Sequence, residues 1–209
     1  MLLGPPASGK GTQAELIQKK FQIPATSTGA ILRREAKLNT PIGREADRII
    51  SKGALAPDDM VLSLVGQWLD QHHEAFLFDG FPRTVAQAVA FERMLASREA
   101  PLDVAIFLEV SESTIAFRMA RRLTCSRCGK VVSIGHHVQN AAEPCPNCGG
   151  KLEVRSDDNH TALALRLEEF RKKSLPLIDF YSGRDLLAKV DADQEADHLF
   201  DQISRVIKA

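Results

Sequence analysis

The feature that most constrains this chain is a glycine-rich loop near its start. Residues 4–12 read Gly-Pro-Pro-Ala-Ser-Gly-Lys-Gly-Thr, which has the G-x-x-x-x-G-K spacing of a phosphate-binding loop. In such a loop, backbone N–H groups converge on a polyphosphate, the next helix adds the positive end of its dipole, and the lysine reaches the outer phosphates. The usual motif has Ser or Thr directly after the lysine, whereas Gly11 comes before Thr12 here. The sequence therefore predicts a phosphate-binding loop with one departure from the general pattern.

The residues on either side of the loop favour this interpretation over a chance lysine in a turn. Residues 1–3 are apolar, as expected at the end of a buried strand. Residues 12–21 are predicted to form a helix with Ile17 and Phe21 on one face. A strand, a glycine-rich loop and a helix in this order form the context in which such loops bind phosphate.

Apolar runs and helical patterns alternate along the rest of the chain. We predict strands at residues 1–3, 23–26, 75–78, 104–108 and 187–190, and helices at 12–21, 30–37, 40–52, 57–69, 85–97, 111–122, 159–174 and 195–207. A clean stripe in the helix that opens at Pro57 indicates a buried face, formed by Val61, Leu64, Val65, Trp68 and Leu69. This alternation implies an α/β fold of three layers, in which a parallel five-stranded sheet is flanked by helices.

The composition excludes several classes of protein. The 209 residues allow one domain with a small insertion, and 44% hydrophobic residues suffice for a sizeable core. Lys plus Arg and Asp plus Glu both number 27, a balance that argues against a general nucleic-acid-binding protein. The chain has no run of about 18 apolar residues, so no membrane span is expected, and its apolar start ends at Gly4, too early for a signal peptide. We therefore expect a cytoplasmic protein with reduced thiols.

Residues 123–155 differ from the rest because they lack helical periodicity and contain all the cysteines. Two C-x-x-C pairs, separated by sixteen residues, have a spacing typical of zinc ribbons: Cys125, Cys128, Cys145 and Cys148. Four thiolates complete the tetrahedral shell of Zn²⁺ and leave no position for substrate, so the predicted site is structural. Two disulfides or a redox pair are alternatives that a reducing compartment disfavours, and iron could occupy the same ligands. His136 and His137, between the pairs, are interpreted as surface residues.

Four motifs follow one another along the chain. They are Gly-x-x-x-x-Gly-Lys-Gly-Thr-Gln at 4–13, Ser27-Thr28-Gly29 with Arg33, Asp79-Gly80-Phe81-Pro82-Arg83 with Gln87, and Arg155-x-Asp157-Asp158 with Arg166. In their order and spacing, these motifs resemble adenylate kinases of the type with a zinc-bearing lid, and the resemblance covers nearly the whole chain. Gly11 after Lys10 is what this family shows, whereas Ala7, Ala30 and Leu123 depart from its common pattern.

The resemblance implies a division of the chain into three parts. Residues 1–26, 57–122 and 156–209 would form the core, residues 27–56 an NMP-binding helical segment, and residues 123–155 a zinc-binding lid. It also implies an ATP:AMP phosphotransferase that makes two ADP, with Mg²⁺ accompanying ATP and structural Zn²⁺ in the lid. The expected partners are therefore ATP, AMP and ADP, without nucleic acid or membrane, and the expected state is a monomer.

The family pattern further implies which residues bind each nucleotide. Those expected to bind ATP are Gly4, Pro5, Pro6, Ala7, Ser8, Gly9, Lys10, Gly11, Thr12, Arg118, Arg122 and Gln194. Those expected to bind AMP are Thr28, Arg33, Ala54, Leu55, Ala56, Gly80, Arg83, Gln87, Arg155 and Arg166. Guanidinium groups match phosphate oxygens, and the amide of Gln87 offers the donor and the acceptor that the edge of adenine requires.

The catalytic residues implied by the same pattern are Lys10, Asp79, Arg83, Arg118, Arg122, Arg155 and Arg166. Arg118 and Arg122 stand four residues apart in the predicted helix 111–122, so both are expected to point from one face at one anion. Phosphoryl transfer needs positioning and charge neutralisation more than covalent chemistry, so no protein nucleophile is assigned. Asp79 is expected to orient waters on Mg²⁺, and closure of the lid to exclude bulk water.

Other interpretations of the same residues differ in substrate or in class. A kinase for UMP, CMP or GMP, or one with GTP as donor, would share the loop, although Thr28 and Gln87 favour AMP. A zinc-ribbon nucleic-acid-binding module with an ATP switch would show a basic, aromatic-rich face, whereas residues 123–155 contain no Phe, Tyr or Trp. A non-catalytic structural relative would not need the lysine and the set of arginines.

Overall fold

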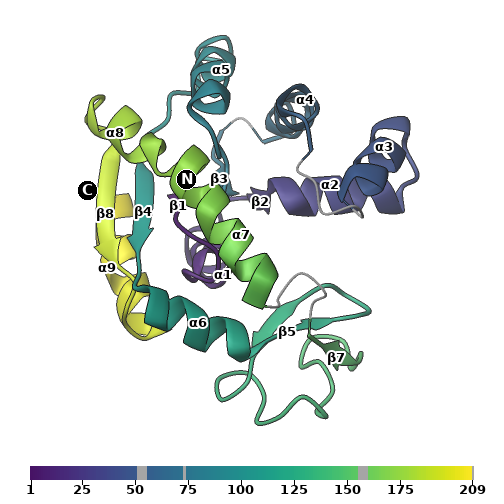
Figure 1. Cartoon of the computed structure of the whole chain (residues 1–209). Helices are drawn as coiled ribbons and strands as arrows, with labels where there is room; N and C mark the ends of the chain where they lie inside the picture. Colours follow the sequence, from purple (N-terminus) through teal and green to yellow (C-terminus); the bar gives the residue numbers. More distant parts are fainter. Residues whose placement is uncertain (51–55, 73, 155–159, 209) are drawn as a thin grey trace.

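A five-stranded parallel sheet forms the centre of the molecule (Figure 1). The computed structural model describes residues 1–50, 56–72, 74–154 and 160–208. The strands of this sheet are β1 (Leu2–Leu3), β2 (Ala25–Ser27), β3 (Leu77–Asp79), β4 (Ala105–Glu109) and β8 (Leu187–Asp191). They pair in the order β2-β3-β1-β4-β8, with all neighbours parallel. The predicted five-stranded parallel sheet is therefore confirmed.

Adjacent residues along the strands face opposite sides of the sheet, and this alternation separates two apolar layers. Leu3, Phe78 and Phe107 belong to one buried cluster, whereas Leu2 and Ile106 belong to the other. The helices that bury residues in the first cluster are α2 (Thr28–Lys37), α3 (Pro41–Ile50), α4 (Asp58–Leu69), α5 (Val85–Ala96) and α8 (Pro176–Ser182). Those that cover the second are α1 (Lys10–Phe21) and α9 (Ala196–Lys208). The three-layer α/β arrangement follows from these two covered faces.

The apolar stripe predicted for α4 faces the first cluster. Val61, Leu64, Val65 and Leu69 are buried there, and Trp68 packs against the cluster while remaining partly exposed. The interpretation of Trp68 as a packing residue is therefore confirmed.

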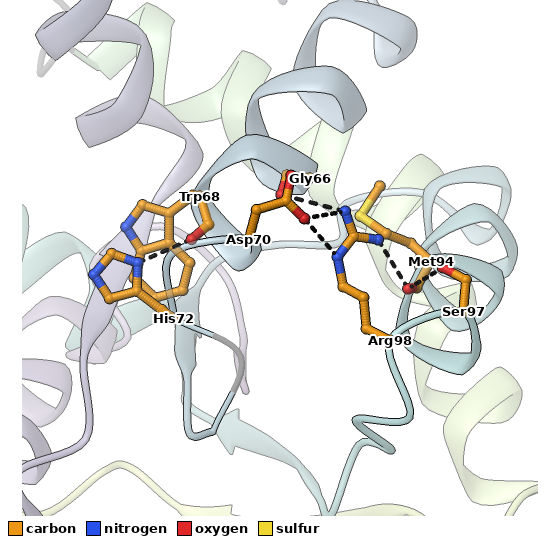
Figure 2. Close-up of polar contacts among 7 residues, drawn as sticks. All are labelled: Gly66, Trp68, Asp70, His72, Met94, Ser97 and Arg98. Atoms are coloured by element: carbon orange, nitrogen blue, oxygen red, sulfur yellow. Dashed lines mark hydrogen bonds and ion pairs between the residues drawn. The ribbon is translucent and has the colours of Figure 1, made fainter.

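Helices α4 and α5 are joined at their C-terminal ends by Arg98, as Figure 2 shows. Its Nε and Nη2 atoms donate to Asp70 Oδ1 at 3.0 and 2.6 Å, and its Nη1 donates to the Met94 carbonyl at 3.0 Å. Beside this contact the His72 ring stacks on Trp68, with ring centroids 4.1 Å apart. These contacts fix the distance between the two helices at one end.

A second, smaller sheet carries the cysteines, and we call residues 122–154 the cysteine sheet. Its strand β5 (Arg122–Cys125) pairs antiparallel with β6 (Val131–Ser133) and β7 (Leu152–Glu153), in the order β6-β5-β7. It has a separate buried cluster, formed by Leu123, Cys125, Val132, Val138, Cys145 and Leu152. In Figure 1 it lies at the ends of α6 (Glu112–Ala120) and α7 (His160–Glu169).

The structure corrects the helix predicted at residues 111–122. The helix α6 ends at Ala120, where the Arg121 N–H donates to the carbonyl groups of Arg118 and Met119. Arg122 instead opens β5, because this strand pairs on both sides and turns alternate side chains into the buried cluster. Arg118 and Arg122 therefore do not share a helix face, and the prediction that they do is wrong.

Two further differences concern the C-terminal part of the chain. The helix predicted at 159–174 is α7 over His160–Glu169 and a π-helix over Phe170–Ser174, and α8 was not predicted. The other predicted helices and strands are present with small shifts of their ends. In the part of the chain that the structure describes, no helix is long and apolar enough to cross a membrane.

Candidate functional site

The glycine-rich loop joins the end of β1 to the start of α1. A Cβ atom on Gly4 would lie 2.9 Å from Ser8 Oγ and 3.0 Å from the Leu108 carbonyl oxygen, so only glycine fits at this close approach. The loop closes with a hydrogen bond from the Ser8 N–H to the Pro5 carbonyl, at 3.3 Å. Gly9 caps α1 without a side-chain hydrogen bond, so the N–H groups of the first helical turn face the loop as donors for an anion.

Lys10 is the first residue of α1, and its side chain folds back over the loop. Its Nζ donates to the carbonyl groups of Gly4 and Pro5 at 2.9 and 2.8 Å, and to Ser8 Oγ at 3.3 Å. Burial lowers the pKa of Lys10 to about 8, Asp79 raises it, and the charges of Arg83, Arg166 and Arg122 lower it again. The ammonium group therefore lies where several cations meet.

Asp79 stands at the carboxyl end of β3, on the edge of the sheet from which the loop also departs. Its register partners are Leu2 of β1 and Ser27 of β2, so the parallel pairing brings it beside the loop. A Cβ atom on Gly11 would lie 3.5 Å from Asp79 Oδ2. Burial raises the pKa of Asp79, while the charges of Lys10 and Arg83 lower it.

Arg83 and Gln87 follow β3 and are joined by one hydrogen bond. The Arg83 N–H donates to Gln87 Oε1 at 2.7 Å, and Arg83 Nε donates to the Gly80 carbonyl at 3.1 Å. Burial lowers the pKa of the Arg83 guanidinium, and so does the charge of Arg166 from α7. Two guanidinium groups thus lie close enough to repel one another, an arrangement that a phosphate stabilises.

The N-terminal turn of α2 carries the next expected site residues. Ser27 Oγ accepts a hydrogen bond from the Ala30 N–H at 3.1 Å and so caps the helix. Thr28 is buried, and Arg33 lies one turn further on the exposed side of α2. Ala56 precedes α4 and packs against the first apolar cluster. Of the remaining expected AMP residues, Ala54, Leu55 and Arg155 lie outside the described residues.

Arg118 links the loop to the connection between β8 and α9. Its Nη1 donates to the Ser8 carbonyl at 3.1 Å, and its Nη2 donates to the carbonyl groups of Ala192 and Gln194 at 2.8 and 3.0 Å. Arg122 belongs to another element, as the first residue of β5, and it lies close enough for its charge to lower the pKa of Lys10. The two arginines therefore converge on the loop from different elements.

The four cysteines gather at one end of the cysteine sheet. Their Sγ atoms lie within 4.8 Å of one another, with Cys125 and Cys148 at 3.5 Å and Cys128 and Cys145 at 3.7 Å. Tetrahedral zinc with Zn–S bonds of about 2.3 Å requires sulfurs about 3.8 Å apart, so the donor set fits. A hydrogen bond from the Lys130 N–H is the main cause that lowers the pKa of Cys128, which favours the thiolate.

The turns after each C-x-x-C pair are tight. Gly129 and Gly149 have φ angles of 73° and 70°, and their N–H groups donate to the carbonyls of Cys125 and Cys145. Neither neighbouring histidine belongs to the cysteine group among the described residues. His136 is exposed, which agrees with its interpretation as a surface residue, whereas His137 is partly buried and its Nδ1 accepts a hydrogen bond from the Ser133 N–H at 3.1 Å.

Sequence reasoning missed one residue of this site. Asp58 lies in the first turn of α4, where its negative charge interacts favourably with the helix dipole. The structure shows that its Oδ1 also accepts a hydrogen bond from Gln87 Nε2 at 2.6 Å. Asp58 and Gln87 are 29 residues apart on different helices, so no local spacing signals the contact.

Comparison with known proteins adds a consistent result over the whole chain. A family model described as adenylate kinase matches residues 2–186. The adenylate kinase of Clostridium tetani is 39% identical over 211 residues, which cover 100% of this chain and 98% of the relative. The adenylate kinase of Thermodesulfovibrio yellowstonii is 38% identical over 210 residues, with 100% and 98% covered. The adenylate kinase of Pseudothermotoga lettingae is 36% identical over 210 residues, with 100% and 97% covered.

Proposed function

This chain belongs to the adenylate kinase family and transfers a phosphoryl group reversibly between ATP and AMP, and we propose that the cations around Lys10 hold the phosphates during the transfer. The observation that supports this proposal is the convergence of positive charge on the loop. The charges of Arg83, Arg166 and Arg122 all act on Lys10, after burial, to lower its pKa. A cluster of cations this close together favours a polyanionic ligand, because phosphate offsets the repulsion between their charges.

ATP occupies the loop in this proposal. Its phosphates accept hydrogen bonds from the backbone of residues 4–12, and Lys10 leaves the carbonyls of Gly4 and Pro5 to bind the outer phosphates. Arg118 lies beside the loop, since its guanidinium donates hydrogen bonds to the carbonyl groups of Ser8 and Gln194. The backbone near Gln194 then contacts the adenine of ATP.

AMP occupies the space between α2 and the segment after β3. Arg33 and Arg83 bind its phosphate, with Arg166 between the two nucleotides, and Gln87 reads the adenine edge. The backbone of Gly80, the side chain of Thr28 and the wall at Ala56 complete the described part of this pocket. The same proposal assigns residues 54, 55 and 155, which lie outside the described residues, to the AMP side.

The chemistry requires no protein nucleophile. The lysine and the arginines neutralise the charge that spreads over the transferring phosphoryl group, and they hold the two nucleotides in line. Mg²⁺ supplies further neutralisation when it arrives with ATP, because it binds mainly through phosphate oxygens and water. Asp79 offers a carboxylate beside the loop, where it orients waters of that ion.

We also propose that the cysteine sheet is the lid and that it holds structural Zn²⁺. The spacing of the four sulfurs supports this, since it matches a closed tetrahedral shell. Arg122 at the start of β5 then couples the position of the lid to the charge around Lys10. In this proposal residues 27–56 form the NMP-binding segment, residues 123–155 form the lid, and the remaining residues form the core.

A monomer in the cytoplasm completes the proposal. Reduced cysteines are what a cytosolic zinc site requires. Light scattering of the purified protein coupled to gel filtration would check the state, and a mass near twice 23.0 kDa would contradict it.

The experiment is phosphoryl transfer from Mg-ATP to AMP, CMP, UMP, GMP and no acceptor, in parallel with Lys10→Ala. We expect rapid ADP formation with AMP alone, and a loss of about a hundredfold or more in the variant. Lys19→Ala is the matched control, because Lys19 lies exposed in the last turn of the same helix. Transfer to another nucleotide would keep the mechanism and move the acceptor pocket. ATP hydrolysis without acceptor preference would contradict the assigned roles.

A further inference from the structure

The amide of Gln87 is held at both of its ends. Its Oε1 accepts a hydrogen bond from the Arg83 N–H at 2.7 Å, and its Nε2 donates to Asp58 Oδ1 at 2.6 Å. Gln87 is a buried residue, only 5% exposed, whereas Asp58 is exposed. A backbone N–H can only donate and a carboxylate can only accept, so the two contacts together define which end of the amide is oxygen and which is nitrogen.

A reversed amide would place two donors together at Arg83 and two acceptors together at Asp58. Each of these contacts would leave an atom of the buried Gln87 amide without a hydrogen-bond partner, which is costly. The amide retains one N–H on Nε2 and one acceptor position on Oε1 after both contacts are made. The free edge of Gln87 therefore presents its donor and its acceptor in one order only.

This order distinguishes two kinds of purine. Adenine presents an acceptor at N1 beside a donor at its 6-amino group, whereas a 6-oxopurine presents a donor at N1 beside an acceptor at O6. A freely rotating glutamine could serve either base by turning its amide over. We propose that Asp58 is a positioning residue that selects adenine over 6-oxopurines by preventing this reversal. The proposal rests on the proposed role of Gln87 in reading the acceptor base.

The surroundings of Asp58 keep the carboxylate in place. Helices α4 and α5 run side by side, and Arg98 joins their other ends through Asp70 (Figure 2). Thr84, which caps α5 by accepting from the Gln87 N–H at 3.0 Å, lies 3.4 Å from Asp58 Oδ2. Asp58 thus contacts both the cap and the amide of the same helical turn.

The test compares Asp58→Asn with Asp59→Asn, using Mg-ATP and either AMP or IMP as acceptor. The asparagine can offer oxygen or nitrogen to Gln87, so a reversed amide gains a partner at position 58 and is opposed only by the Arg83 N–H. We expect the ratio of kcat/KM for AMP to that for IMP to fall about tenfold or more in Asp58→Asn, mainly through KM for the acceptors, with KM for ATP unchanged. Asp59 lies exposed in the same turn, and its substitution removes the same charge from the helix N-terminus, so its ratio should match that of the unmodified protein.

Two further variants keep the outcomes distinct. Gln87→Ala should also reduce the ratio of kcat/KM for AMP to that for IMP, because it removes the amide that contacts the base. A reduced ratio in Gln87→Ala with an unchanged ratio in Asp58→Asn would overturn the role of Asp58 alone. An unchanged ratio in both would overturn the role of Gln87 and, with it, this inference. If Asp58→Asn lowers the melting temperature, Asp58→Ser, which can also donate or accept, provides the same comparison in a second background.

Discussion

The cysteine sheet and the helical arm formed by α2 and α3 both extend from the central sheet (Figure 1), but they bury their apolar side chains in different places. In the cysteine sheet, Leu123, Val132 and Leu152 pack in a cluster of their own. In the helical arm, Ile31 and Leu32 belong to the first apolar cluster, together with residues of β1 and β3. The cysteine sheet therefore depends on a small core and on the zinc proposed for its four cysteines, whereas the helical arm shares the stability of the whole domain.

The largest expected effect comes from removing the metal. Structural zinc contributes about 10–16 kcal/mol of apparent binding energy in small zinc-binding peptides, far more than a cluster of this size supplies. A strong chelator, or Cys145→Ser, should therefore unfold the cysteine sheet while the central sheet and the helical arm stay folded. Hydrogen exchange would show lost protection at residues 122–154 alone, and phosphoryl transfer would fall roughly tenfold or more because Arg122 loses its position.

Adding zinc back is the control for the chelated protein. Restored protection and activity would show that the loss is due to the metal. If the metal-free protein kept its exchange pattern, its melting temperature and its activity, the contrast between the two regions would not hold.

Truncating one buried leucine to alanine in each region tests whether the helical arm and the cysteine sheet unfold separately. Leu32 and Leu152 are buried to a similar degree, at 6% and 4% exposed. Leu32→Ala should lower the free energy of unfolding of the whole domain by about 2–4 kcal/mol, because it leaves a cavity in the shared core. Leu152→Ala should leave the main transition in urea within about 0.5 kcal/mol and speed exchange only in the cysteine sheet. Equal effects of both changes on the main transition would indicate a single cooperative unit.

The pH dependence of ATP binding provides another test of the cysteine sheet, because the charge of Arg122 in this sheet lowers the pKa of Lys10. The pKa of Lys10 is lowered to about 8 in the folded protein, first by burial. Phosphate favours the charged form, so ATP binding should take up a proton above pH 8, and affinity should fall by up to about tenfold per pH unit there. Calorimetry in two buffers of different ionisation enthalpy measures this uptake.

Two controls bear on the same titration. Lys10→Arg stays charged and should show no uptake. In the metal-free protein the charge of Arg122 is no longer held nearby, so the pKa of Lys10 should rise. Without ligand, the unfolded chain binds more protons than the folded one between pH 8 and the ordinary value of 10.5, so the stability of the domain should increase with pH across this window.

We expect the least change from removing an ion pair between the cysteine sheet and α1. Among the described residues, this ion pair is formed by Lys130 and Glu15. Lys130 Nζ lies 3.2 Å from Glu15 Oε2, and the glutamate side chain is largely exposed. Exposed ion pairs contribute little, so Lys130→Ala should speed exchange in the cysteine sheet by about two- to fivefold at most. Lys151→Ala is the matched control, because its partner Glu153 lies within the same sheet at 2.9 Å. A comparable effect in the helical arm would contradict the separation of the two regions.

Features set by short spacings were predictable from the sequence. The loop at residues 4–12, the alternation of strands and helices, and the two C-x-x-C pairs each lie within a few residues, and the structure has all of them where expected. Their conformations depend on neighbouring residues, so a pattern of residue types is sufficient to identify them.

The prediction for Arg122 failed because the end of α6 is not a local property. Helical spacing continues through Arg122, but the strand pairing of β5 on both edges and the burial of Leu123 take the chain out of the helix. Tertiary packing commonly overrides helix propensity in this way, because the propensity difference per residue is below about 1 kcal/mol. Arg122 still reaches the site, from a different element than expected.

The phosphate loop, the order of the elements and the four-cysteine cluster were thus predictable from short patterns of residue types. The hydrogen bond between Asp58 and Gln87 depends on how the helices pack, and so does the origin of Arg118 and Arg122 in separate elements near Lys10. The physical reason is distance along the chain. Contacts between residues tens of positions apart exist only because helices pack at a particular place on a sheet, and that place depends on all the side chains buried between them.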